Sequence, residues 1–414
     1  MSTPRPPGTA TPAPDAAPAR VLVVGAAASE RDTLGRRVEQ EGYAVGAAGS
    51  GEEALGKLRA EPSDLVLLDA RTPGTDGPRF LETLRGDAEL APVPVIVVSA
   101  AEDIELLERC LAAGADDCLP GAFGPAMLRA RLGAALDRRR LRDAESLSRE
   151  MDVARNIQRD FLPESLPAAP GVQLEAALQP ARQVSGDFYD AFLLPPAGTI
   201  VLVVGDVCDK GVGAALFMAL FRSLIRASAD PVGGGAIQMI GGRRTIVRQS
   251  LESATPADLL TRVAGFTNDY IARLHGRTNM FATVFLGALT PRTGQLDYVN
   301  AGHEPALVVA PDGTTRELRP TGPALGLLPD TFFGAGEATL GRGDCLVAFT
   351  DGLVEARNPA GAAFGTERLR EALRAHNTSA AELVRGVTEA LHAFTGQAEP
   401  HDDVTLLAAL RTSG

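Results

Sequence analysis

The sequence predicts an α/β domain followed by an α+β domain. Short apolar strands alternate one by one with amphipathic helices over residues 20–137, and this alternation is typical of a parallel sheet with helices on both faces. Over residues 166–412 strands come in groups with long helices between them, which indicates α+β layers. At 414 residues the chain is long enough for two full-sized cores.

In the α/β domain, each predicted strand is a short apolar run bounded by helix or turn signals. The strands are expected at residues 21–25, 43–49, 64–69, 94–100 and 118–120, and the helices at 28–42, 50–61, 78–87, 103–113 and from 125. In an open parallel sheet the functional crevice lies at the carboxyl ends of the strands, where Asp69 and Ser99 stand. Residues 1–19 are rich in Pro, Ala and Thr and are expected to form a disordered tail.

A long helix is predicted between the two domains. From Pro125 to Phe161 the chain has no helix breaker except Gly133, which gives a helix of roughly 55 Å at ~1.5 Å per residue. We assign residues 138–165 to this linker. Its apolar residues follow a partial 3/4 repeat that charges interrupt, so a coiled coil and a single exposed helix both remain open.

The α+β domain is expected to contain grouped strands around two long central helices. The strands are predicted at residues 173–179, 184–194, 199–206, 280–289, 295–300, 305–310, 345–350 and 404–410, and the helices at 213–228, 255–274 and, as one or two helices, 364–394. Residues 231–243 are Gly-rich and are expected to be a mobile insertion between two helices.

Composition excludes several classes of protein. The net charge of −12 argues against nucleic acid or an anionic membrane as the main partner. The longest apolar runs are too short to span a bilayer, and no signal peptide is visible. The four cysteines are scattered without a CxxC pair, which argues against a zinc site or a disulfide framework and favours a cytoplasmic protein.

Four aspartates stand where predicted strands meet loops, namely Asp187, Asp206, Asp351 and Asp402. One such aspartate alone is usually a turn former or a helix cap. Here glycines flank three of them, which leaves room for an ion and its waters close to the backbone. Mg²⁺ and Mn²⁺ take oxygen ligands, and two such ions can activate water for in-line attack on phosphorus. The pattern therefore predicts a metal-dependent phosphatase.

Residues 151–412 resemble the SpoIIE/RsbU branch of the metal-dependent serine/threonine phosphatases, the PPM or type 2C class. The resemblance is carried, in family order, by the stretches MDVARNIQRDFLP, VSGDFYD, GDVCDKGVGAALFMA, MFATVFLGAL, VNAGHEPALVV, PALGLLPD, GDCLVAFTDGLVEARN and DDVTLL. It implies a sandwich of two antiparallel sheets flanked by helices, with two Mg²⁺ or Mn²⁺ ions at one end. Its implied substrate is a phosphoprotein, an anti-sigma-factor antagonist of the STAS type.

The resemblance also implies roles for individual residues. Asp206 would bridge both ions, with the backbone carbonyl of Val207 as a further ligand. Asp187 would bind directly or through water, and Asp351 and Asp402 would complete the second ion. Water held between the ions would attack the phosphoserine or phosphothreonine without a covalent phospho-enzyme. Asp206 and Asp351 are taken as the catalytic pair.

Three further acids are assigned to the surroundings of the ions. Asp190 is expected to support a ligand, and Asp209 either does so or begins the turn into the next helix. Strand alternation favours an Asp403 that points to solvent. His303 is interpreted as a loop brace rather than a general acid. Arg182 is the nearest candidate for a phosphate-binding arginine.

The first domain resembles a response-regulator receiver domain, which is flavodoxin-like. The stretch DLVLLDARTPGTDG places Asp69 at the phosphoacceptor position, and VIVVSA places Ser99 at the hydroxyl position. Receivers carry an acidic pair and a lysine that offset charge during phosphoryl transfer. Here those positions hold Gly25, Ala26 and Gly121. We therefore interpret the domain as a pseudo-receiver for dimerisation or protein binding.

Two hypotheses from different classes follow. The first is a phosphatase regulated through its receiver-like domain, acting as a homodimer, with a histidine kinase or another regulator as a partner. The linker would transmit the signal, so substituting Ile157 or Phe161 is expected to remove regulation and keep basal activity. The second is a catalytically silent scaffold in the same kind of pathway. A DNA-binding regulator is excluded, because the chain is acidic and has no basic helix-turn-helix after the receiver.

Overall fold

The computed structural model divides into two compact units, with the boundary between Arg149 and Glu150. The predicted domain borders lie at residues 137 and 165, on either side of it. Of the predicted tail, residues 1–17 lie outside the described part of the chain. The structure describes residues 18–412 except 71, 73–75, 100–102, 121, 195–197, 230–234, 241–242, 249–254 and 377.

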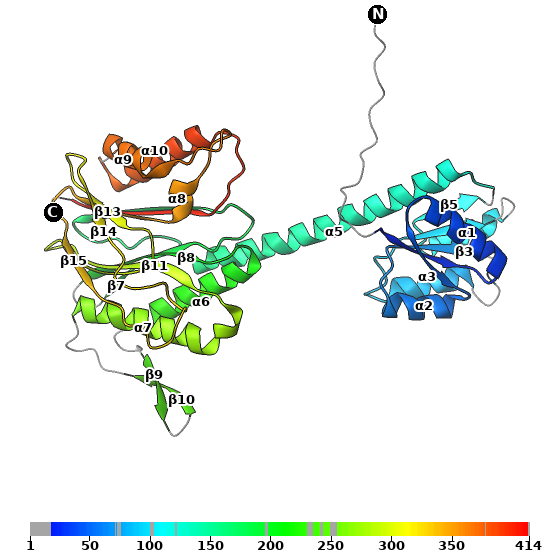
Figure 1. The fold of residues 1–414 in the computed structure, drawn as a ribbon, viewed down its shortest axis with the longest axis horizontal. Helices are drawn as coiled ribbons and strands as arrows, with labels where there is room; N and C mark the ends of the chain where they lie inside the picture. Colours follow the sequence, from blue (N-terminus) through cyan, green and yellow to red (C-terminus); the bar gives the residue numbers. More distant parts are fainter. Residues whose placement is uncertain are drawn as a thin grey trace, which may run out of the picture. The chain divides into compact units, whose positions relative to one another are not determined.

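The first unit is built on a five-stranded parallel sheet with strand order β2-β1-β3-β4-β5 (Figure 1), which confirms the predicted α/β class. Its strands are β1 (Arg20–Val24), β2 (Ala44–Ala48), β3 (Leu65–Asp69), β4 (Val95–Ser99) and β5 (Asp117–Pro120). Its helices are α1 (Ala28–Gln40), α2 (Gly51–Ala60), α3 (Gly77–Gly86), α4 (Ile104–Ala112) and the start of α5 (Pro125–Phe161).

Strand alternation divides the core of this unit between the two faces of the sheet. Leu22 and Leu68 pack on one face against α2, α3 and α4. Val21 and Leu67 point to the other face, where they pack against α1 and against Leu132 of α5. Both faces are covered, so the strands read as continuous apolar runs in the sequence.

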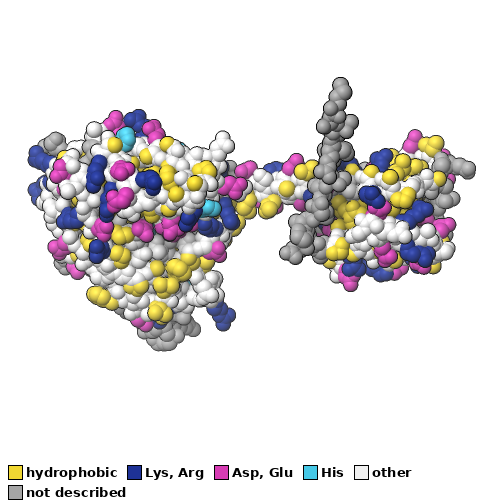
Figure 2. Space-filling model, turned by 45° about the horizontal axis from the view of Figure 1, so that its top comes forward, with side chains coloured by type: hydrophobic (Ala, Val, Ile, Leu, Met, Phe, Trp, Pro, Cys, Tyr) yellow, Lys and Arg dark blue, Asp and Glu magenta, His cyan; other side chains and the backbone are white. Residues whose placement is uncertain are grey.

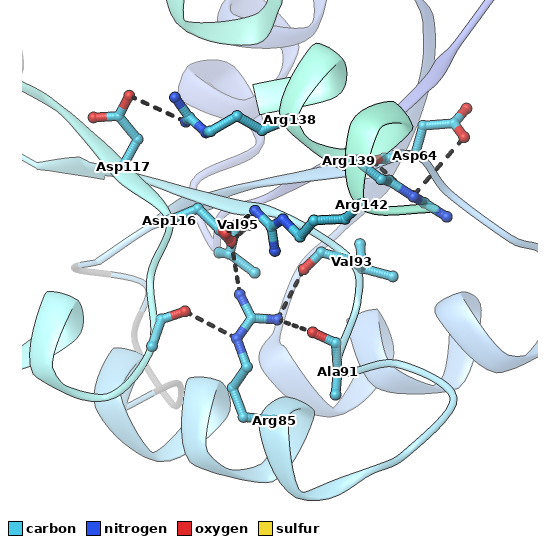
Figure 3. A network of polar contacts seen from close by, with 11 residues as sticks. Asp64, Arg85, Ala91, Val93, Val95, Asp116, Asp117, Arg138, Arg139 and Arg142 are labelled. Carbon is cyan, nitrogen blue, oxygen red and sulfur yellow. Dashed lines mark hydrogen bonds and ion pairs between the residues drawn. The ribbon is translucent and has the colours of Figure 1, made fainter. Parts of the chain in front are cut away.

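Arginines fasten α5 to the first unit, as Figure 3 shows. Arg142 of α5 donates to one oxygen of Asp116 over 3.2 Å, and Arg85 donates to the other oxygen over 2.8 Å. Arg139 of α5 donates to the carbonyl of Asp64 over 2.8 Å. Because charge-assisted bonds on both sides hold Asp116, this part of α5 is fixed in register against the sheet.

The second unit contains two five-stranded sheets, in which all the pairs between strands are antiparallel (Figure 1). The first sheet has the order β15 (Gly336–Thr339), β12 (Gln295–Ala301), β11 (Ala282–Thr290), β8 (Thr199–Val207) and β7 (Phe188–Leu194). The second has the order β14 (Thr315–Leu318), β13 (Ala306–Val309), β16 (Cys345–Phe349), β17 (Val404–Arg411) and β6 (Val172–Gln179). Neither β14 nor β15 was predicted, because each is a four-residue, largely polar edge strand.

The two sheets form a sandwich with helices on both outer faces, as the resemblance implied. Inner residues of both sheets, such as Phe285 and Leu407, belong to one buried cluster. Helices α6 (Val212–Ala229) and α7 (Pro256–Leu274) cover the first sheet. Helices α9 (Gly365–Ala375) and α10 (Ala380–Thr395) cover the second, and α8 (Asp351–Glu355) follows β16.

Two further segments of the second unit were addressed by the sequence-based predictions. The predicted insertion at residues 231–243 lies partly outside the described residues, but β9 (Gly235–Ile240) and β10 (Arg243–Arg248) form an antiparallel pair. Helix α6 is long and apolar enough by composition to cross a membrane. Its buried residues Met218 and Phe221 lie in the core of the unit, and 33% of the helix is buried.

Candidate active site

The sandwich brings the four predicted aspartates to one end. Asp187 directly precedes β7 and Asp206 lies near the end of β8, and these strands are antiparallel neighbours with Phe188 opposite Gly205. Asp351 is the first residue of α8, just after β16, and Asp402 stands two residues before β17. Strands β16 and β17 are again antiparallel neighbours. Each sheet therefore contributes one strand end and one neighbouring strand start.

Asp187 connects the two sheets through hydrogen bonds. Its side chain is buried, and its Oδ2 accepts bonds from Thr350 Oγ1 over 2.7 Å and from Thr405 Oγ1 over 2.8 Å. Thr350 Oγ1 in turn accepts the backbone N–H of Thr405 over 2.9 Å. Sequence reasoning missed both threonines, although they stand in the same short motifs as Asp351 and Asp402.

The carboxylates raise one another's pKa. Burial and the nearby charges of Asp351 and Asp402 raise the pKa of Asp206 to about 7. Burial and the charge of Asp402 also raise the pKa of Asp351. Burial is the main cause that raises the pKa of Asp187 well above the ordinary value, and the charge of Asp206 is the second cause. Such crowding is unfavourable unless a cation offsets the charge.

The donor set and the backbone around it fit a hard cation. A Cβ on Gly186 would lie 2.9 Å from the carbonyl oxygen of Val207, and a Cβ on Gly352 would lie 1.9 Å from that of Asp403. The glycines beside Asp187 and Asp351 thus let neighbouring backbone segments pack closely at this end of the sandwich. The ammonium of Lys210 lies 2.9 Å from Asp402 Oδ2, so Asp402 already binds one positively charged group. Within the described residues, no three His, Cys, Asp or Glu side chains already surround one point.

The three supporting acids have different surroundings. Asp190 is buried and pairs with Arg222 over 3.1 Å and with Arg226 over 2.8 Å, so it braces α6 against β7. Asp209 is exposed in the turn before α6, with a φ of 72°. The expectation that Asp403 points to solvent is wrong. It is buried, and its two oxygens each accept a backbone N–H over 2.7 Å, from residues 181 and 186, because the loop before β7 folds over it.

His303 acts as a brace. It is buried, and its Nδ1 lies 2.8 Å from Thr283 Oγ1 on β11. Burial lowers the pKa of His303 to about 4, so the ring is neutral at pH 7. Its neighbour Glu304 was not predicted, yet burial and the charges of Asp351 and Glu355 raise its pKa. For Glu355 a signal was available, because it stands four residues after Asp351 in a short helix, but no local pattern pointed to Glu304.

Helix α5 reaches the same end of the second unit. The side chain of Gln158 is buried and makes two hydrogen bonds with the backbone of Ser185. Its Nε2 donates to the carbonyl over 2.6 Å, and its Oε1 accepts the N–H over 2.9 Å. Ser185 stands two residues before Asp187, so the end of α5 is tied to the loop of a candidate ligand. Arg182, in the same loop, is exposed.

The first unit keeps the arrangement of Asp69 and Ser99 that is typical of a receiver, but it does not have the acidic pair of a receiver. Asp69 ends β3 and Ser99 ends β4 at the same edge of the sheet. A Cβ on Gly25 would lie 3.7 Å from the Cβ of Asp69, so an acid there would stand beside Asp69. Arg31 instead donates to the carbonyl of Gly25 over 2.7 Å. Gly121 lies outside the described residues.

Comparison with known proteins places this architecture in a class. The family described as "Stage II sporulation protein E (SpoIIE)" matches residues 196–412, and "Response regulator receiver domain" matches residues 21–133. The chain belongs to the SpoIIE family and carries a receiver domain before it. Its second unit also has the fold of the SiaA-PP2C domain of Pseudomonas aeruginosa, with a TM-score of 0.51 and 22% identity over 66% of this chain and 99% of that one.

Two relatives each match a little under two thirds of this chain. Protein IcfG of Synechocystis is 38% identical over 273 residues, which is 63% of this chain and 41% of IcfG. Phosphoserine phosphatase RsbU of Bacillus subtilis is 26% identical over 269 residues, which is 64% of this chain and 71% of RsbU. The chain thus spans well under two thirds of IcfG.

Proposed function

We propose that this protein is a metal-dependent protein serine/threonine phosphatase. The observation that carries the proposal is the convergence of Asp187, Asp206, Asp351 and Asp402, with Asp206 held at a pKa of about 7 by burial and by its acidic neighbours. Membership of the SpoIIE family supports the reaction class.

The residues of the chain would divide the work at this site. Asp206, Asp351, Asp402 and the carbonyl of Val207 would hold two Mg²⁺ or Mn²⁺ ions, and Asp187 would bind directly or through water. When bound, such ions supply a water of lowered pKa and offset the charge of the phosphoryl group. The threonine bonds to Asp187 fix its carboxylate before any substrate arrives, which lowers the reorganisation that the reaction requires.

The substrate is inferred to be a phosphorylated protein, an anti-sigma-factor antagonist of the STAS type. The relative RsbU is named a phosphoserine phosphatase, and 64% of this chain matches it. On the face of the described residues drawn in Figure 2, acidic and basic side chains are interspersed without a continuous basic patch. That surface suits a protein partner better than nucleic acid.

Regulation is inferred to pass through α5, in a cytoplasmic homodimer. Hydrophobic side chains on this helix are exposed, including Leu147 and Ile157, at 57% and 56%. A second copy of the helix would cover them. The same helix carries Gln158, whose bonds to Ser185 connect it to the candidate ligands. A histidine kinase or another regulator would act on the receiver.

A scaffold role is the second candidate, and one observation favours it for the first unit alone. Gly25 and Ala26 stand where receivers carry an acidic pair that binds Mg²⁺, so these two positions offer no carboxylate to hold a cation for phosphoryl transfer at Asp69. We propose that the receiver binds protein without being phosphorylated efficiently.

Hydrolysis of p-nitrophenyl phosphate with added Mn²⁺ tests the proposed activity. The full chain is expected to hydrolyse the ester, and EDTA is expected to abolish the activity. The hydrolysis rate is expected to be at least about 100-fold lower in Asp206→Ala and in Asp351→Ala. Asp209→Ala is the matched control, since this exposed acid lies in the loop next to Asp206. Equal activity in all four proteins would refute the assignment.

A further inference from the structure

Lys210 stands at the candidate metal site in an unusual position for a cation. It lies in the turn between β8 and α6, where Asp209 and Gly211 adopt left-handed backbone angles of 72° and 85°. Its ammonium is 2.9 Å from Asp402 Oδ2 and also donates to the carbonyl of His401. The side chain is 36% exposed, so it has room to move.

The positive charge of Lys210 reaches a second candidate ligand. It lowers the pKa of Asp351, against the larger raising effects of burial and of Asp402. The ammonium is paired with Asp402, and its charge also acts on Asp351, the other carboxylate that would share an ion. A divalent ion and an ammonium at the same pair of carboxylates repel each other, so they compete for that place.

The choice of lysine at this position is itself informative. The chain has 40 basic residues, and only Lys57 and Lys210 among them are lysines. Arginine forms a planar fork that suits fixed ion pairs, and Asp190 in this protein is paired with Arg222 and Arg226. Lysine is a compact, hydrated point charge on a flexible stem. That chemistry suits a cation that holds a carboxylate and then leaves.

We propose that Lys210 is an internal counter-cation that holds Asp402 in the ion-free protein and must be displaced when the divalent ion binds. Lys210 thereby sets the ion concentration at which the site fills. The inference rests on the proposed metal-dependent function, because it requires that the site take an ion.

Isothermal titration of the full chain with Mn²⁺ alone tests the proposal. Lys210→Met removes the competing charge and is expected to bind Mn²⁺ roughly tenfold more tightly than the unsubstituted chain. Lys210→Gln, which is polar and uncharged, is expected to behave in the same way and guards against misfolding of the first variant. Lys210→Arg keeps the charge and is expected to stay within about threefold of the original affinity. Lys57→Met is the matched control and should change nothing.

Thermal unfolding gives a second readout that does not depend on activity. In EDTA, Lys210→Met leaves the carboxylates without their internal cation and is expected to unfold at a lower temperature than the original chain. Added Mn²⁺ should then raise its unfolding temperature by more than it raises that of the original chain.

The outcomes separate the two claims. If the original chain binds Mn²⁺ and Lys210→Met binds it equally or more weakly, the counter-cation role is wrong and the proposed function stands. If the original chain binds no Mn²⁺, the proposed function fails and the inference fails with it. Tighter binding in both uncharged variants, with unchanged affinity in Lys57→Met, supports the inference.

Discussion

The two units of this protein both place aspartates at the ends of strands, and they differ in what stands beside them. In the second unit burial and the nearby charges of Asp351 and Asp402 raise the pKa of Asp206 to about 7. In the first unit Asp69 stands beside Gly25, and the carbonyl of Gly25 accepts a hydrogen bond from Arg31. A fold can therefore keep the edge at which chemistry takes place and lose the neighbours that the chemistry requires. Function has to be argued from the neighbours.

A methyl group added to the second unit should abolish most of the activity, whereas one added to the first should change little, and this is the largest effect we expect. In Gly352→Ala the new Cβ would fall 1.9 Å from the carbonyl oxygen of Asp403, so the backbone beside Asp402 must move. Mn²⁺-dependent hydrolysis is expected to fall at least about 100-fold, because a displacement near 1 Å is enough for such a loss.

Gly25→Ala is the matched control for that substitution. Its Cβ would meet the nearest atom at 3.7 Å, an ordinary contact beside Asp69. Hydrolysis and the unfolding temperature should both stay close to their original values. Equal losses in the two variants would show that the glycines serve general stability and not the site.

The contacts of α5 with the first unit and with the second unit allow a further comparison of the two. Gln158→Ala leaves the N–H and the carbonyl of Ser185 without their partners, at a cost of about 1–3 kcal/mol for a buried pair. Since Ser185 leads into Asp187, hydrolysis is expected to fall about tenfold. Arg142→Ala, which loosens the helix only at the receiver, should keep basal hydrolysis. A reversed order of the two effects in a steady-state assay would contradict this account.

The smallest effect at neutral pH concerns His303. Burial lowers its pKa from 6.5 to about 4, so the folded protein disfavours the charged ring. A lowered folded pKa contributes stability above pH 6.5, and that stability is lost as the pH falls toward 4. The loss amounts to about 3 kcal/mol at most. His303→Gln should unfold with a flatter dependence on pH over this range, as measured by urea denaturation at each pH.

The parallel sheet, the long helix and the four aspartates could be predicted because each depends on local patterns. Apolar runs such as that of β8 are readable within a single segment, and so is the glycine beside Asp351. The bonds of Asp187 to Thr350 and Thr405 could not be predicted, because they join residues 163 and 218 positions apart. The same reason explains why Gln158 was missed.

Strand alternation misled the prediction for Asp403. The rule assigns successive side chains to opposite faces of a strand. Asp403 stands before the first residue of β17, where the rule no longer applies, and a loop from the other sheet folds over it. The burial of polar groups at strand ends is decided by such loops, which the sequence pattern does not place.

Anomalous diffraction from crystals of the full chain soaked in Mn²⁺ tests the central comparison most directly. The account predicts two anomalous peaks among Asp206, Asp351 and Asp402, and none beside Asp69. A peak beside Asp69, or an empty site at Asp206 in the same crystals, would contradict the assignment of the chemistry to the second unit.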